Sequence, residues 1–182
     1  MSGTYRVVGT GDSILSMTLG FAPPGGVCHT EEQTWVDTEY GRNPYTAGMA
    51  GRASTASIWP LVLDRSRYGG WIIIQDNGVG CPDSLWERLI QQIVDETPDD
   101  RCLMFIPPVF HPDWNATHAA HAAARAAVMV AIATEQPVRS TIPWHVAVSN
   151  DATLVTDGQH PSTSGKIWLR RHIERFVGAG TF

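Results

Sequence analysis

The sequence predicts an α/β fold in which a five-stranded parallel sheet lies between two layers of helices. Two observations predict this three-layer α/β/α sandwich. Five short apolar runs have the composition of buried strands, and segments with helical periodicity lie between them. Strands separated by helices of this length form parallel sheets, because each helix crosses over the sheet before the next strand begins.

The predicted strands are short apolar runs bounded by glycine or polar residues. The first lies in YRVVG, a β-branched run that ends at a glycine. The third lies in WIIIQDNG, where three isoleucines precede a polar turn. The five strands are predicted at residues 5–8, 35–38, 71–75, 102–106 and 141–146.

Three segments predict helices. Residues 83–97 place their apolar side chains on one face, with Asp83 or Ser84 as the N-cap. Residues 115–136 are rich in alanine and end before Pro137. The segment ILSMTLGF, residues 14–21, suits a helix poorly and predicts only a strand-to-helix turn. A last helix is predicted in residues 161–178, with core positions Ile167, Leu169, Ile173 and Phe176.

Length and composition are typical of one globular domain spanning residues 1–182. Hydrophobic residues make up 43% and charged residues 17% of the chain, and no repeat or long linker divides it. No apolar run is long enough to span a membrane. The first residues carry no secretory signal pattern, so we expect a cytoplasmic protein, with an extracellular or viral-particle setting also open.

Charge and cysteine content exclude several kinds of binding site. The net charge is −5 and the basic residues are scattered, which argues against a nucleic-acid partner. Cys28, Cys81 and Cys102 lack CxxC spacing, so free thiols are expected rather than disulfides or a zinc site. His118 and His121 lie one helical turn apart without a third ligand, and no metal is predicted.

Two short motifs, one near each end of the chain, contain the residues of a nucleophilic site. Gly11-Asp12-Ser13 follows the first strand, and chemistry in parallel sheets gathers at the carboxyl ends of strands. Asp157 and His160 lie in DGQHP, just before the last helix. A serine needs an imidazole to accept its proton, and the imidazole needs a carboxylate to fix its tautomer. Each motif is also common as a helix cap.

Together and in this order, the motifs resemble those of the SGNH (GDSL) hydrolase family. That family has an early Gly-Asp-Ser and a late Asp-x-x-His-Pro. Its two middle motifs match Gly51, in TAGMAGRAST, and Asn77, in WIIIQDNG. Here Gln75 and Gly78 replace the glycine and the aspartate of the usual Gly-x-Asn-Asp, and Thr46 replaces an asparagine ahead of Gly51.

The resemblance implies a flavodoxin-like SGNH hydrolase fold and a catalytic mechanism without cofactor or metal. Ser13 would attack an ester carbonyl, with His160 as general base and Asp157 orienting it. The backbone amides of Ser13 and Gly51 and the side-chain amide of Asn77 would form the oxyanion hole.

The resemblance also points to the residues around the substrate. The segment FIPPVFHPDW, residues 105–114, resembles the substrate-lining loop of the family, so Phe110, His111 and Trp114 are candidate substrate-binding residues. Asp12 is a further candidate, because it could hold the nucleophile turn. Its other interpretation is a carboxylate at the N-terminus of a helix.

Three functions are compatible with these motifs. The first is a serine esterase acting on acetyl or other short-chain esters of a small molecule, carbohydrate or lipid. The second is an O-acyltransferase that uses the same triad to acylate a cell-wall or surface sugar. The third is a carbohydrate-binding module without catalytic activity. The oligomeric state is not predicted.

Overall fold

The computed structural model describes residues 5–19, 27–30, 34–38, 59–75, 82–134 and 139–178. Within these residues six strands form one sheet, in the order β2-β3-β1-β4-β5-β6. Five of them run parallel, and β2 pairs antiparallel with β3 at the edge. The predicted five-stranded parallel sheet is therefore confirmed, with one strand added. The strands are β1 (Tyr5–Gly11), β2 (Val27–Thr30), β3 (Thr34–Thr38), β4 (Ser66–Gln75), β5 (Cys102–Ile106) and β6 (Arg139–Thr141).

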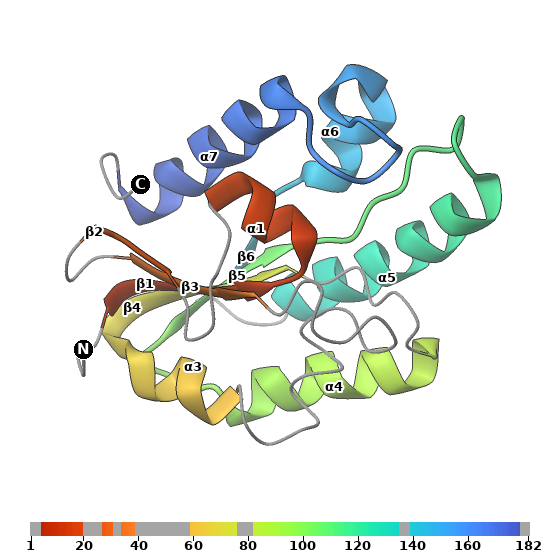
Figure 1. The fold of residues 1–182 in the computed structure, drawn as a ribbon. Helices are drawn as coiled ribbons and strands as arrows, with labels where there is room; N and C mark the ends of the chain where they lie inside the picture. The colour runs from red at the N-terminus through yellow and green to blue at the C-terminus, as the bar shows by residue number, and fades with distance from the viewer. Residues whose placement is uncertain are drawn as a thin grey trace.

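Helices cover both faces of this sheet, which gives the predicted three layers (Figure 1). One face carries α1 (Ser13–Leu19), α6 (Trp144–Asn150) and α7 (Thr163–Val177). The opposite face carries α3 (Trp59–Arg65), α4 (Asp83–Glu96) and α5 (Ala116–Thr134). A short 3₁₀ helix, η1 (Ala152–Leu154), joins α6 to the loop before α7.

The hydrophobic core consists of two clusters, one on each side of the sheet. Successive residues of a strand contribute to opposite clusters, because side chains alternate along a strand. Val8 and Ile72 pack against α3, α4 and α5, whereas Val7 and Ile73 pack against α1, α6 and α7. All four side chains are fully buried. Burial of both faces explains why the central strands are almost entirely apolar.

Two predictions about secondary structure were wrong. The predicted strand at 141–146 ends at Thr141, and α6 begins at Trp144. Pro143 lies between them and has no N–H to extend a strand ladder. Residues 14–19 form a helix after all, because Ile14, Leu15 and Leu19 are buried against the sheet.

Details of two other predicted helices also differ. The N-cap of α4 is Pro82, and neither Asp83 nor Ser84 caps it. The carboxylate of Asp83 instead binds Arg125 of α5. In α7, Leu169 and Ile173 are fully buried as predicted, but Ile167 and Phe176 are 47% and 43% exposed and are not core residues.

Candidate active site

The predicted nucleophile lies where β1 passes into α1. Ser13 is the first residue of α1, two residues after the end of β1, and is only 7% exposed. Asp12, before it, is buried, and its Oδ1 accepts a hydrogen bond of 2.9 Å from the amide of Ile14. Asp12 therefore holds the nucleophile turn, which agrees with both interpretations of this residue.

A tight loop before α7 carries the other two predicted catalytic residues. Val155 and Pro161 form a β-bridge that closes the loop, and the amide of Thr156 donates to the carbonyl of His160 over 2.9 Å. Ser162 then caps α7 by accepting a hydrogen bond from the amide of Gly165. Fixed at both ends, this loop orients Asp157 and His160.

The fold brings Ser13, His160 and Asp157 into one hydrogen-bonded chain. Ser13 Oγ lies 2.8 Å from His160 Nε2, and His160 Nδ1 lies 2.5 Å from Asp157 Oδ2. An ionised carboxylate can only accept, so Nδ1 carries the hydrogen and Nε2 is left to accept one from the serine hydroxyl. This tautomer is the one that a general base for Ser13 requires.

The electrostatics of Asp157 keep it ionised. Burial raises the pKa of this carboxyl, but three hydrogen bonds oppose it: one from the His160 side chain, and those from the amides of His160 and Gln159. They outweigh burial, so the pKa lies below its ordinary value. An ionised Asp157 can stabilise an imidazolium at His160 throughout the neutral pH range.

Gln75 is a residue at the site whose role the sequence did not reveal. It ends β4 beside Gly11, is fully buried, and its Oε1 accepts from the amides of Asp12 and Leu15 at 3.2 Å each. Its signal in the sequence was a polar residue closing an apolar strand, at the position of the family's glycine. Its hydrogen bonds depend on how β1 and β4 pair, which the sequence does not state.

The segment after β5, which holds the candidate substrate-binding residues Phe110, His111 and Trp114, lies against the loop that carries Asp157 and His160. The amide of His111 donates to the carbonyl of Gly158 over 2.7 Å. A Cβ built on Gly158 would lie 2.8 Å from Phe110 and 2.9 Å from Trp114, so both aromatic residues pack directly on this glycine. His111 is buried, whereas Trp114 is 56% exposed and faces solvent beside the loop.

Several other predicted residues fall elsewhere. Gly51 and Asn77 lie outside the described residues, as does Cys81. His121 Nδ1 lies 3.3 Å from Asp83, and Cys102 is a partly buried free thiol whose pKa is raised by burial.

In the described segments no three His, Cys, Asp or Glu side chains are grouped to hold a metal ion. None of the helices described there has the length and apolar character needed to cross a membrane.

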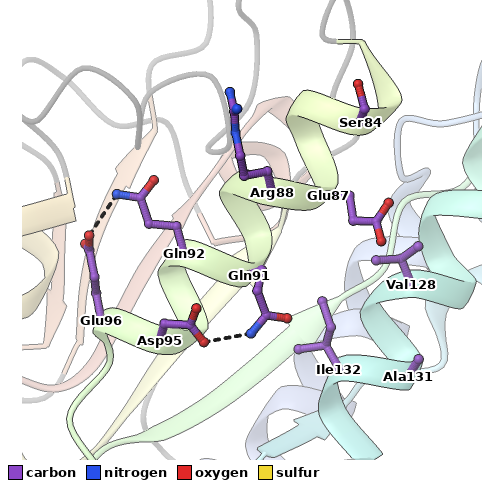
Figure 2. Close-up of a pocket in the computed structure, with 10 residues that line it drawn as sticks. All are labelled: Ser84, Glu87, Arg88, Gln91, Gln92, Asp95, Glu96, Val128, Ala131 and Ile132. Atoms are coloured by element: carbon purple, nitrogen blue, oxygen red, sulfur yellow. Dashed lines mark hydrogen bonds between the residues drawn. The ribbon is translucent and has the colours of Figure 1, made fainter.

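A groove lies between α4 and α5, and Ser13 is not among the residues that line it (Figure 2). This groove has a volume of about 700 Å³. On the α4 side of the groove, some polar side chains are hydrogen-bonded to one another: Gln91 donates to Asp95, and Gln92 donates to Glu96. The α5 side contributes small and apolar residues: Val128, Ala131 and Ile132.

The fold is shared with a known acetylxylan esterase. The sequence matches no protein-family model and no curated protein. Among solved structures, two catalytic mutants of Axe2, an acetylxylan esterase from Geobacillus stearothermophilus, resemble the chain with a TM-score of 0.70 at 16% and 15% identity. The match covers 100% of this chain and 98% of theirs. A candidate platelet activating factor from Streptococcus pneumonia matches 96% of this chain and 84% of its own, with a TM-score of 0.60 and 15% identity. The chain therefore has an SGNH hydrolase-like fold, as its sequence motifs predicted.

Proposed function

We propose that the protein is a serine esterase that hydrolyses small acyl esters. The observation that carries the proposal is the hydrogen-bonded chain from Ser13 through His160 to Asp157, whose members come from opposite ends of the sequence. A buried serine, a correctly protonated imidazole and an ionised carboxylate form the constellation needed for acyl transfer. The esterase neighbours agree with this chemistry.

The reaction follows from the geometry. Ser13 Oγ attacks the ester carbonyl carbon while His160 Nε2 takes the hydroxyl proton and Asp157 stabilises the imidazolium. The tetrahedral intermediate breaks its bond to the alcohol oxygen, which receives the proton from His160. Water then attacks the acyl-serine, again giving a proton to His160, and the carboxylic acid leaves as Ser13 recovers its proton.

The proposed oxyanion hole consists of the amides of Ser13 and Gly51 and the side chain of Asn77. One observation supports the first donor. The amides of Asp12, Ile14 and Leu15 all have side-chain acceptors, whereas none of the described residues accepts from the amide of Ser13. That amide lies beside the nucleophile, where the oxyanion would form.

The proposed substrate is an acetyl or other short-chain ester of a carbohydrate. Trp114 supports the carbohydrate part, since it offers an exposed indole next to the loop that carries the general base. Sugar rings present apolar faces that pack on such aromatic surfaces. Phe110, His111 and Asp12 complete the proposed substrate-binding set, with Asp12 acting through the nucleophile turn.

The decisive test compares hydrolysis of p-nitrophenyl esters of increasing acyl length by the wild type and by Ser13→Ala. We expect the highest kcat/KM on the acetyl ester and a loss of at least about 1000-fold in the variant, because the nucleophile is gone. Ser84→Ala, an exposed serine on α4, is the matched control and should retain full activity. A Ser13→Ala variant as active as its parent would exclude the mechanism.

An inactive wild type would instead favour the acyltransferase or the binding module. Adding sugar acceptors to the same assay separates these two functions. A transferase would release p-nitrophenol only when an acceptor is present, whereas a binding module would remain inactive.

Trp114→Ala tests the carbohydrate part of the proposal. We expect kcat/KM on an acetylated xylo-oligosaccharide to fall roughly 3- to 10-fold, equivalent to about 0.5–1.5 kcal/mol of lost aromatic contact. Activity on p-nitrophenyl acetate, which has no sugar, should change less than twofold. Phe176→Ala, an exposed aromatic residue on α7, is the control. Equal losses on both substrates would contradict a sugar-binding role.

A further inference from the structure

Gln75 is placed to act on the nucleophile turn from the neighbouring strand. It is the last residue of β4, pairs with Gly11 in the sheet, and is fully buried. Its side-chain oxygen accepts two hydrogen bonds of 3.2 Å, from the amide before Ser13 and from the amide two residues after it. A single atom of another strand therefore accepts hydrogen bonds from both sides of the turn that presents the nucleophile.

The orientation of the Gln75 side chain follows from its partners. Both groups that face it are N–H donors, so the oxygen and not the nitrogen must point to the turn. The Nε2 group is buried, and it has no hydrogen-bond partner among the described residues.

The contacts of Gln75 act together with those of Asp12. The Gln75 side-chain oxygen accepts hydrogen bonds from the amides of Asp12 and Leu15, and the Asp12 carboxylate accepts one from the amide of Ile14. The amides on both sides of Ser13 are thus occupied. β1 and β4 approach closely here, because a Cβ on Gly11 would lie 2.6 Å from the carbonyl oxygen of Gln75, so only glycine fits at this position.

We propose that Gln75 is a positioning residue for catalysis, which fixes the direction of the Ser13 amide and hydroxyl by holding the amides on either side of them. The inference rests on the proposed esterase function and extends it to a residue that does not touch the substrate. A glycine, the residue of the Gly-x-Asn-Asp pattern at this position, has no side chain that could make these contacts.

The test compares Gln75→Met with Gln75→Glu. Methionine has a similar volume but offers no strong acceptor, whereas glutamate keeps an oxygen in reach of both amides. The measurements are the free energy of unfolding, kcat/KM for p-nitrophenyl acetate at the pH optimum of each variant, and the rate of Ser13 labelling by a fluorophosphonate. Thr10→Val, at a fully buried position of β1 one residue before Gly11, controls for a polar-to-apolar change in the same place.

We expect Gln75→Met to lower both kcat/KM and the labelling rate roughly 10- to 100-fold, since small displacements of a nucleophile or an oxyanion donor have effects of this size. Gln75→Glu should recover at least tenfold of that loss, and Thr10→Val should stay within twofold of the wild type. If Gln75→Met does not fold, Gln75→Asn replaces it, because asparagine keeps the amide but is too short to reach both partners.

Other outcomes separate this inference from the esterase proposal. An active wild type with a folded Gln75→Met or Gln75→Asn variant within threefold of it overturns the role of Gln75 alone. Stable glutamate and methionine variants with equal losses overturn it too, because the acceptor would then not matter. A wild type that neither hydrolyses the ester nor reacts with the fluorophosphonate overturns both proposals.

Discussion

Among single residues, Gly158 shows how the loop that carries Asp157 and His160 depends on a missing side chain. It lies between Asp157 and His160 with φ of +92°, a conformation that other residues adopt only with strain. Its open side is filled by Phe110 and Trp114, at distances too short for a Cβ. The glycine thus allows the loop to turn and lets the segment after β5 pack against it.

Replacing Gly158 with alanine should therefore damage both stability and activity. Backbone strain and overpacking together should lower the free energy of unfolding by roughly 2–4 kcal/mol. Displacement of His160 should lower kcat on p-nitrophenyl acetate roughly 10- to 100-fold. Denaturant unfolding and steady-state kinetics measure the two effects.

Gly69→Ala is the matched control for this prediction. Gly69 also has a positive φ, of +66°, but nothing lies within 4 Å of its Cβ position. We expect this variant to lose about 1 kcal/mol of stability through backbone strain and to keep full activity. If Gly158→Ala behaved no differently from Gly69→Ala, packing on the catalytic loop would have no importance.

Among the secondary-structure elements, helices with a clear periodic pattern of apolar residues could be predicted from the local sequence. The segments that became α4 and α5 show clear helical patterns and breakers, and the observed helices lie within two residues of the predicted ends. α1 was not predicted, because its stability comes from burial of Ile14, Leu15 and Leu19 against a sheet that the local sequence does not describe. β2, a four-residue edge strand, was not predicted either.

The residues of the candidate site divide in the same way, into those that a local motif predicts and those whose contacts depend on the complete fold. Ser13, Asp157 and His160 could be predicted because each lies in a short motif with its own chemical logic. Gln75 could not be assigned its role, since its hydrogen bonds join two strands separated by 63 positions in the sequence. Likewise, the packing of Trp114 on Gly158 depends on the relative placement of two loops.

At the scale of the whole molecule, the parallel sheet explains why these residues meet. Ser13 follows the end of β1, Gln75 ends β4, and Trp114 lies in the segment after β5. The loop before α7 returns to the same edge of the sheet. Parallel strands place all their carboxyl ends on one side. The site is thus assembled by the complete fold, so conditions that unfold the molecule also remove the site.

Acid is such a condition, and two kinds of group determine its effect. Burial lowers the pKa of His145, so the folded protein favours its neutral form. The pKa of Asp83 is also lowered, chiefly by its hydrogen bond from Arg125. The pKa of Asp157 is lowered too, because hydrogen bonds from His160 and Gln159 outweigh the effect of burial. In every case the unfolded chain binds protons more readily than the folded protein does, so protonation favours unfolding.

The free energy of unfolding should therefore fall in two stages as the pH decreases. The first begins near pH 6.5, the ordinary pKa of histidine, and continues down through the lower pKa of folded His145. The second begins near pH 3.9, the ordinary value for aspartate. Urea unfolding between pH 8 and pH 3 measures both stages. His145→Gln should flatten the first stage and leave the second, whereas Asp83→Asn should weaken only the second. Stability that rises on acidification from pH 7 to pH 5, or a first stage unchanged in His145→Gln, would show that these groups do not control the acid response.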